Sequence, residues 1–307
     1  MKEPPKPYRL RYFTPLRYPG GKGKLAAYIK RLMKVNGLLD GEYVEPYAGG
    51  AGIALELLFH EYVASIRIND VSRPVHAFWK AVLNHTDELC KLVIDTPLTV
   101  RVWDKQRRIL ENAADHDDLA LGFATFFLNR TNRSGILNGG IIGGRDQTGP
   151  WKIDARYNAH ELAYRIESIA RMKGRIHLTR QDALRFLKSG VIRWPEKTLI
   201  YLDPPYYVKG RDLYYDFYKP QDHAHVADFV MTSIKQQRWI VSYDNAPAIR
   251  ELYKGSPHIV YDIGYSARSS RLGSEVMFFG DGLKVPSIVG SINLTEDHTR
   301  DSRRRAA

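Results

Sequence analysis

The sequence contains one cysteine, Cys90, among its 307 residues. A single thiol excludes an intrachain disulfide and a zinc site built from several cysteines. Cys90 lies in the stretch Asp87-Glu88-Leu89-Cys90-Lys91-Leu92, which predicts a packing residue on a helix. His223 and His225 resemble a metal-binding pair, but residues two apart on a helix do not face each other. We therefore expect no metal.

Long hydrophobic runs are also missing. No stretch reaches the ~18 consecutive apolar residues that a membrane-spanning helix needs. The N-terminus is rich in proline and lysine and does not resemble a signal peptide. We therefore expect a cytoplasmic protein with no membrane partner. A hydrophobic content of 44% is ordinary for a globular protein, and 307 residues allow one large domain or two.

Two common nucleotide-binding motifs are incomplete. The stretch Arg17-Tyr18-Pro19-Gly20-Gly21-Lys22-Gly23-Lys24 lacks the GxxxxGK[ST] spacing of a P-loop. After Glu45-Pro46-Tyr47-Ala48-Gly49-Gly50-Ala51-Gly52, Leu55 occupies the place of the third glycine in the dinucleotide fingerprint GxGxxG. A dinucleotide oxidoreductase is therefore disfavoured. Both stretches still place glycines before a helical pattern, where exposed backbone amides favour anions.

Acidic residues are outnumbered, 34 against 46 Lys and Arg, which gives a net charge of +12. Such a balance favours a polyanionic partner, because phosphates attract every cation placed near them. The alternative is charge that serves solubility alone.

The apolar run Thr198–Leu202 predicts a buried strand, which ends at Asp203-Pro204-Pro205-Tyr206. Proline cannot continue a sheet ladder, so Asp203 is held at the carboxyl end of a strand, where open α/β sheets bind ligands. The Asp203 carboxylate and the Pro204 carbonyl would accept hydrogen bonds from an amine on a flat group, and Tyr206 would stack on its ring. The alternative is a rigid turn in which Asp203 is only a local cap.

Strand ends carry further acids. A strand at 43–45 leads through the glycine turn into a helix at 53–58, and a second strand at 64–68 ends in Asp70. The distance from Gly52 to Asp70 is typical of an acid that binds ribose hydroxyls. Glu45 is a further candidate contact. Asp182 follows a strand at 175–179 and could accept a hydrogen bond from the adenine of a cofactor. Together these features favour a nucleoside-containing cofactor.

Between residues 72 and 173 the pattern changes to amphipathic helices at 74–84, 86–94 and 118–129. Basic, glycine-rich sequence follows from Asn129 to Arg145, with turn signals at Asn138-Gly139-Gly140. Arginine and asparagine read guanine and adenine edges in DNA, so we favour a nucleic-acid contact surface over a solvated insertion. The sheet continues with strands at 239–243, 258–263 and 275–279, after a helix at 220–236.

In combination, these stretches resemble the Dam family of adenine-specific DNA methyltransferases, over most of residues 8–285. Tyr18–Lys22 is similar to the N-terminal motif of that family, and Glu45–Gly52 to its cofactor loop, with Tyr47 where phenylalanine is usual. Asp70 matches the ribose-binding acid, and Asp203–Tyr206 the DPPY catalytic motif. Asn129–Gly140 looks like the target-recognition segment, and the order of the motifs is that of the α group.

The resemblance implies an α/β, Rossmann-like S-adenosylmethionine-dependent methyltransferase domain at 8–72 and 174–285. It also implies a mainly helical target-recognition insertion at 73–173 and a flexible basic tail at 286–307. The implied cofactor-binding residues are Tyr18, Lys22, Glu45, Tyr47, Gly49, Asp70, Asp182 and Asp203. The implied catalytic residues are Asp203, Pro204, Pro205 and Tyr206, and the implied DNA contacts are Asn129, Arg130, Asn132, Arg133, Asn138 and Arg268.

The implied reaction is direct transfer of a methyl group to the amino group of an adenine flipped out of double-stranded DNA. Methylation of RNA adenine or of a protein amide is an alternative, although motifs there more often begin with Asn than with the Asp found at 203. A DNA-binding protein that keeps the fold without catalysis is another. A monomer and a partnership with a restriction endonuclease are both compatible with the sequence, which leaves the recognition site open.

Overall fold

The computed structural model describes residues 12–17, 22–208, 218–264, 272–287 and 293–299 of the chain. The chain divides into two compact units. One unit comprises Met1–Arg17 and Ala77–Gly174, and the other comprises Tyr18–His76 and Arg175–Ala307. We call them the helical unit and the sheet unit and describe each by itself.

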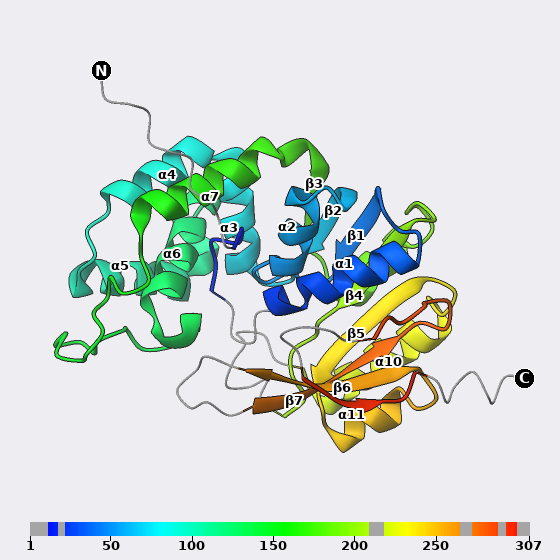
Figure 1. The fold of residues 1–307 in the computed structure, drawn as a ribbon. Helices are drawn as coiled ribbons and strands as arrows, with labels where there is room; N and C mark the ends of the chain where they lie inside the picture. The colour runs from blue at the N-terminus through cyan, green and yellow to red at the C-terminus, as the bar shows by residue number, and fades with distance from the viewer. Residues whose placement is uncertain (1–11, 18–21, 209–217, 265–271, 288–292, 300–307) are drawn as a thin grey trace, which may run out of the picture. The chain divides into compact units, whose positions relative to one another are not determined.

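In the sheet unit, the described strands form one sheet in the order β3-β2-β1-β4-β5-β7-β6-β8 (Figure 1). Their bounds are β1 Gly41–Glu45, β2 Val63–Asn69, β3 Ile176–Thr179, β4 Thr198–Leu202, β5 Arg238–Asp244, β6 His258–Gly264, β7 Leu272–Phe279 and β8 Asn293–Asp297. The pairs from β3 to β5 are parallel, whereas β7 is antiparallel to β5 and β6. The order 3-2-1-4-5 is that of a doubly wound sheet, and its switch point lies between β1 and β4. The predicted Rossmann-like α/β class is confirmed.

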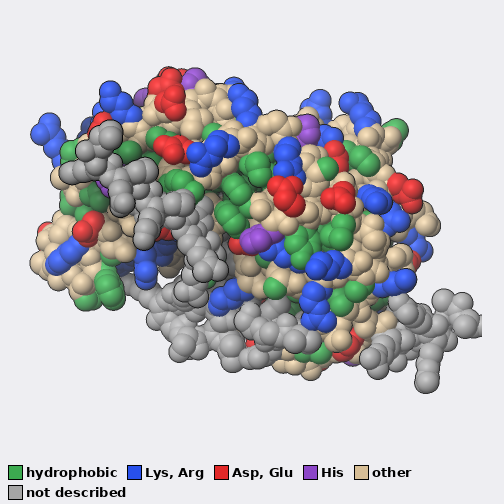
Figure 2. All heavy atoms as spheres, turned by 45° about the horizontal axis from the view of Figure 1, so that its top comes forward, with side chains coloured by type: hydrophobic (Ala, Val, Ile, Leu, Met, Phe, Trp, Pro, Cys, Tyr) green, Lys and Arg blue, Asp and Glu red, His purple; other side chains and the backbone are tan. Residues whose placement is uncertain are grey.

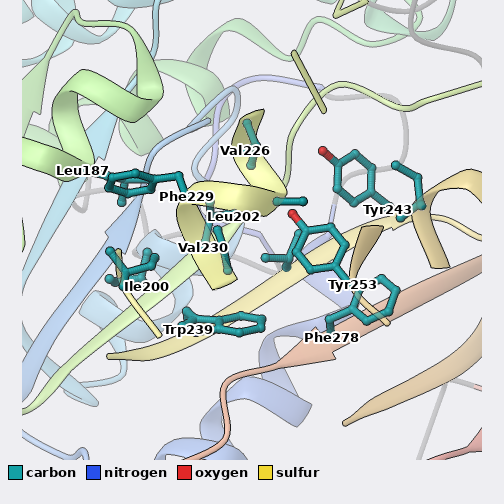
Figure 3. Close-up of a cluster of buried hydrophobic side chains, with 14 of the residues drawn as sticks. Leu187, Ile200, Leu202, Val226, Phe229, Val230, Trp239, Tyr243, Tyr253 and Phe278 are labelled. Atoms are coloured by element: carbon teal, nitrogen blue, oxygen red, sulfur yellow. The ribbon is translucent and has the colours of Figure 1, made fainter. Parts of the chain in front are cut away.

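Helices follow the parallel strands, as crossover connections require. In this unit they are η1 Lys22–Leu25, α1 Ala26–Val35, α2 Gly52–Phe59, α8 Ala183–Gly190, α10 Pro220–Thr232 and α11 Pro247–Leu252. All five residues of β4 are buried, because a central parallel strand is covered on both faces. Phe229 and Val230 of α10 belong to the same buried cluster as Ile200 and Leu202 of β4 (Figure 3). This packing fixes the end of β4, where Asp203 follows.

The helical unit is built around α6, Asp118–Thr131, which is buried almost all round. The other α-helices described in this unit are α4 Thr86–Asp95, α5 Val100–Glu111 and α7 Ala159–Arg171. Helix α3, Arg73–Asn84, begins in the sheet unit and continues into this one. The short helices described here are η2 Ala113–Asp115, η3 Arg133–Gly135 and η4 Lys173–Arg175. A helix without a polar face must be enclosed by its neighbours. Gly122 permits a close approach, since a Cβ atom there would lie 2.6 Å from the Ala77 carbonyl oxygen of α3.

Most predicted elements are confirmed, with bounds shifted by a few residues. The predicted flexible tail from residue 286 is wrong for Asn293–Asp297, which forms β8 against β6. This strand is polar and its residues 294–297 are exposed, so it lacks the alternation of apolar residues that indicates a strand. Residues 300–307 lie outside the described part of the chain.

The structure bears on the role of Cys90, on metal binding by the histidine pair and on membrane-spanning helices. Cys90 is buried on α4, and burial raises the pKa of its thiol to about 12, which confirms a packing role. His223 is buried and its Nδ1 lies 3.0 Å from the Tyr243 hydroxyl. Among the described residues, no three His, Cys, Asp or Glu side chains gather as metal ligands, and none of the helices is long and apolar enough to cross a membrane.

Candidate active site and recognition segment

Asp203 follows β4 directly, and its carboxylate is held by one of its two oxygens. The Ser242 hydroxyl of β5 donates to Asp203 Oδ1 at 2.8 Å, and Lys22 Nζ lies 3.5 Å from the same oxygen. No donor among the described residues bonds to Oδ2. The Asp203 side chain is 24% exposed. The carboxylate is therefore fixed in orientation and keeps one oxygen for a ligand.

Lys22 lies between two acids. It is 7% exposed, and its Nζ is 2.5 Å from Glu275 Oε2 of β7, closer than to Asp203. The Tyr206 hydroxyl donates to Glu275 Oε1 at 2.6 Å and also lies 3.3 Å from Lys22 Nζ. Tyr206 is 4% exposed, so the predicted stacking on a base stays a prediction. Sequence reasoning missed Glu275, although an acid inside a predicted apolar strand is itself a signal.

The electrostatics of the site follow from burial. Desolvation raises the pKa of Asp203, Lys22 opposes this increase, and the Glu275 charge adds to it. Glu45, at the end of β1, is 5% exposed and accepts a hydrogen bond from the Ala54 amide of α2 at 3.3 Å. Burial raises the pKa of Glu45 to about 8. A carboxylate with a raised pKa accepts hydrogen bonds more strongly, which suits Asp203 to an amine.

The chain after Asp203 is anchored by a further acid that sequence reasoning did not assign. The amides of Tyr207 and Val208 donate to the two oxygens of Asp244, at 2.8 and 2.9 Å. Asp244 ends β5, so the loop is attached to the neighbouring strand. No donor among the described residues bonds to the Pro204 carbonyl, and Pro205 is half-buried. The two predicted acceptors are thus adjacent at the end of β4, where Pro204 is buried and Asp203 is half-buried.

Asp70 connects two strand ends. Its Oδ2 accepts the Gly49 amide at 2.8 Å, and its Oδ1 accepts the Ser72 amide at 3.0 Å. Gly49 belongs to the glycine loop after β1, with a φ of 46°. Tyr47, in the same loop, is half-buried and accepts a hydrogen bond from the Tyr218 hydroxyl at 3.1 Å. The structure therefore brings Asp70, Gly49 and Tyr47 to one edge of the sheet.

A cavity of about 480 Å³ lies at the ends of β2 and β3. Its lining residues are Val71, His76, Arg180, Gln181, Asp182 and Arg185. Val71 is 48% exposed, which is unusual for an apolar side chain next to a strand end. Asp182 is exposed and caps α8 by accepting the Arg185 amide at 3.0 Å. The cavity thus lies at the carboxyl edge of the parallel strands, where open α/β sheets bind ligands, and its lining includes one carboxylate, Asp182.

Two of the predicted DNA contacts are buried and need correction. Asn129 is 2% exposed, and its side-chain amide bonds to both Arg17 and Gly135. Asn132 is fully buried, accepts from Trp103 Nε1, and donates to backbone carbonyls of the turn that follows. Asparagine amides mimic backbone hydrogen bonds in turns. These two side chains are therefore part of the packing that holds the turn after α6.

The remaining predicted DNA contacts of the helical unit differ in exposure. Arg133 and Asn138 are exposed. Arg130 is half-buried, and burial, with Arg165 and Arg17 nearby, lowers its pKa to about 9. Arg130 Nε has no hydrogen-bond partner among the described residues. Glu161 pairs with Arg165. One acid cannot neutralise the three arginines, so this cluster keeps an excess of positive charge.

Two predicted residues, Tyr18 and Arg268, lie outside the described residues. On the face in Figure 2, Lys and Arg side chains are interspersed with Asp and Glu, so the excess positive charge is spread out there. Spread charge can attract a long polyanion without defining where it binds.

The strand order places this chain in the class of Rossmann-like α/β proteins, in which ligands bind at the carboxyl ends of the strands. Residues 18–116 match the family model described as D12 class N6 adenine-specific DNA methyltransferase. This match, which spans less than half of the chain, supports an adenine methyltransferase family. It includes Lys22, Glu45 and Asp70 and ends before the segment at Asp203.

Other comparisons add little. No curated protein matches the chain. A solved structure with similarity is the rRNA methyltransferase aviRa from Streptomyces viridochromogenes, with 13% identity and a TM-score of 0.36 over 87% of this chain and 88% of that one. A likeness this distant bears on neither substrate nor mechanism.

Proposed function

We propose that this chain transfers a methyl group from S-adenosylmethionine to the exocyclic amino group of an adenine flipped out of double-stranded DNA. The observation that carries the proposal is the Asp203 carboxylate, bound through Oδ1 and open at Oδ2, beside the Pro204 carbonyl at the end of β4. The matched family model, although it ends before Asp203, supports the same chemistry.

The acceptors act on a weak nucleophile. The adenine amino nitrogen is unreactive because its lone pair is delocalised into the ring. Asp203 Oδ2 and the Pro204 carbonyl would accept hydrogen bonds from the two N–H groups of this amine. These hydrogen bonds would return electron density to the nitrogen and orient it. S-adenosylmethionine, when bound, would supply the methyl group: the carbon–sulfur bond would break as the carbon–nitrogen bond forms, the sulfur would leave as a neutral thioether, and the proton lost from nitrogen would pass to water. No covalent bond to the protein is needed.

The cofactor site follows from the sheet edge. Asp70, whose two oxygens accept the Gly49 and Ser72 amides, lies at the strand end where an acid would bind ribose hydroxyls. The cavity beside Val71 and Asp182 would take the adenine of the cofactor, with Val71 against the ring. Glu45 and Lys22 would line the end nearer to Asp203, because both interact electrostatically with that carboxylate.

DNA is the favoured substrate for two reasons. The motif begins with Asp203 rather than Asn, and the chain carries a net charge of +12. Base extrusion costs a few kcal/mol, and phosphate contacts can offset this cost. We assign such contacts to Arg130, Arg133 and Asn138 of the helical unit. RNA methylation and a catalytically inactive DNA-binding role remain the alternatives that the experiment must separate.

The test is methyl transfer from labelled S-adenosylmethionine to duplex DNA of mixed sequence and to RNA of the same sequence. We expect label in DNA, at the adenine amino group. Asp203→Ala should lower the rate by about 10³-fold or more, because one of two acceptors on the amine is lost. DNA binding should stay within about threefold, since the change adds no clash.

The matched control is Asp281→Ala, which removes an exposed acid of the same unit without changing transfer. Label in RNA alone would favour the RNA enzyme. DNA binding without transfer in the wild-type protein would favour the inactive DNA-binding alternative. Full activity of Asp203→Ala would refute the role of this carboxylate.

A further inference from the structure

Glu275 is a buried acid in the middle of β7 that the proposed reaction has not yet used. Its side chain is 1% exposed. It accepts from Lys22 Nζ at 2.5 Å, from the Tyr206 hydroxyl at 2.6 Å and from the Tyr261 hydroxyl at 2.7 Å. A carboxylate is buried to this extent only when charged or polar donors surround it.

The ammonium of Lys22 lies closer to one of its two acidic partners than to the other. Its Nζ is 2.5 Å from Glu275 and 3.5 Å from Asp203. The closer contact draws the ammonium away from Asp203. Asp203 therefore has the longer of the two ion pairs with Lys22, through Oδ1, and no donor among the described residues bonds to its Oδ2.

Glu275 also holds the last residue of the catalytic motif. One of its oxygens binds Tyr206, and the other binds Lys22 and Tyr261. The same carboxylate thus binds both the cation that contacts Asp203 and the hydroxyl at the end of the motif. Neither task could be performed by an apolar residue of similar size.

We propose that Glu275 is a positioning residue, which holds the Lys22 ammonium and the Tyr206 hydroxyl so that Asp203 keeps one oxygen open for the substrate amine. This inference rests on the proposed function, because it assigns Glu275 a role in the reaction at Asp203. Glu275 acts through Lys22 and Tyr206 and does not touch the reacting atoms.

The titration of Asp203 reports the position of Lys22 without any need for methyl transfer. The charges that act on Asp203 come from Lys22 and Glu275. Other ionisable groups coupled to it are Glu45, Tyr43, Tyr201, Tyr243 and Tyr261. The pKa values of the four tyrosines are raised, so these side chains are neutral where a carboxyl group titrates. In Glu275→Gln the ammonium would lose its nearer acid and turn to Asp203. An opposite charge favours the ionised form, so the pKa of Asp203 would fall.

The experiment is carboxyl NMR of the full chain labelled in aspartate, with Asp203→Asn to identify the signal. In Glu275→Gln we expect the pKa of Asp203 to fall by about 1 or more. Loss of the negative charge of Glu275 would by itself also lower the pKa of Asp203. Glu275→Gln is therefore repeated in a Lys22→Met background, where no ammonium can move. There the decrease in the pKa of Asp203 should be less than half as large.

Two further variants control for disruption of packing. Tyr261→Phe removes a donor to Glu275 but leaves Lys22 on it, so the pKa of Asp203 should not change. If Glu275→Gln does not fold, Glu275→Asp keeps the charge and withdraws the carboxylate by one methylene. It should give a smaller decrease in the same direction.

Methyl transfer gives a second readout. We expect kcat of Glu275→Gln to fall about 10- to 100-fold, because Asp203 is misoriented, while KM for DNA stays within about threefold. Equal pKa decreases with and without Lys22, or the same decrease in Tyr261→Phe, would overturn the inference. If the wild-type protein transfers no methyl group but the NMR result is as expected, the proposed function fails and the geometry around Lys22 stands.

Discussion

At the scale of single residues, the buried Glu45 and the half-buried Asp203 differ in the groups that bind them. Asp203 is bound by Ser242 and faces Lys22, whereas Glu45 accepts one backbone amide at the start of α2. Burial raises the pKa of both carboxyl groups, and for Glu45 the value is about 8. Lys22 stabilises the ionised form of Asp203, whereas none of the described cations contacts Glu45. Burial therefore destabilises the ionised form of Glu45 more than that of Asp203.

This difference predicts how stability depends on pH. The pKa of Glu45 is higher in the folded protein than its ordinary value of 4.5, so the folded state binds the proton more tightly. The contribution of Glu45 to the free energy of unfolding is fully present below that ordinary value and is lost as the pH rises through about 8. Between these two limits the free energy of unfolding changes by about 3–5 kcal/mol.

Glu45→Gln removes the ionisation and keeps an oxygen for the Ala54 amide. We expect its Tm to exceed that of the wild type by several degrees at pH 8.5 and by little at pH 5. The control Glu251→Gln changes an exposed acid and should shift Tm equally at both values. An advantage of Glu45→Gln that does not grow with pH would contradict this assignment. Calorimetry at matched ionic strength measures both.

At the scale of elements, the close contact between α3 and α6 makes Gly122 a sensitive position. A Cβ atom at Gly122 would lie 2.6 Å from the Ala77 carbonyl oxygen and 3.0 Å from the Ala81 Cβ. Backbone cannot move aside cheaply, so the helices would have to separate. Alanine is the better helix former, so propensity alone predicts the opposite effect.

Gly122→Ala should therefore destabilise the protein by about 1–3 kcal/mol, as overpacking does in other cores. Gly140→Ala is the matched control, because nothing lies within 4 Å of its added methyl group. That change should stay within about 0.5 kcal/mol. Urea denaturation followed by far-UV circular dichroism measures both. A stabilised Gly122→Ala protein would show that the two helices are not in close contact in solution.

At the scale of the whole molecule, the net charge of +12 governs how the proposed DNA substrate binds. Counterion release makes such binding fall steeply with salt, by about 10³-fold or more between 50 and 200 mM for six or more phosphate contacts. Arg133 is exposed in the turn after α6, where we propose contacts with phosphates. Arg133→Ala should weaken DNA binding and reduce the slope of log K against log salt by about 1.

Lys91→Ala provides the control, since Lys91 is an exposed cation of the same unit on α4. Its slope should match that of the wild type. Fluorescence anisotropy with labelled duplex DNA at four salt concentrations measures these slopes. An unchanged slope for Arg133→Ala would remove Arg133 from the proposed phosphate contacts.

Local sequence was sufficient for the elements and for the acids at their ends. Apolar runs, glycine turns and the two prolines after Asp203 act within a few residues, so the strands β1 to β7 and the strand-end positions of Asp70, Asp182 and Asp203 could be predicted. The polar strand β8 could not, because it pairs with β6 without an apolar pattern of its own.

Tertiary structure decided which side chains meet. Lys22 and Glu275 are 253 positions apart in the sequence and touch only because β7 inserts between β5 and β6. It also decided that Asn129 and Asn132 are buried, although their residue types are typical of DNA contacts. Sequence determined the strand ends because backbone preferences are local, whereas the partners of a buried charge depend on chain segments that only the folded sheet brings together.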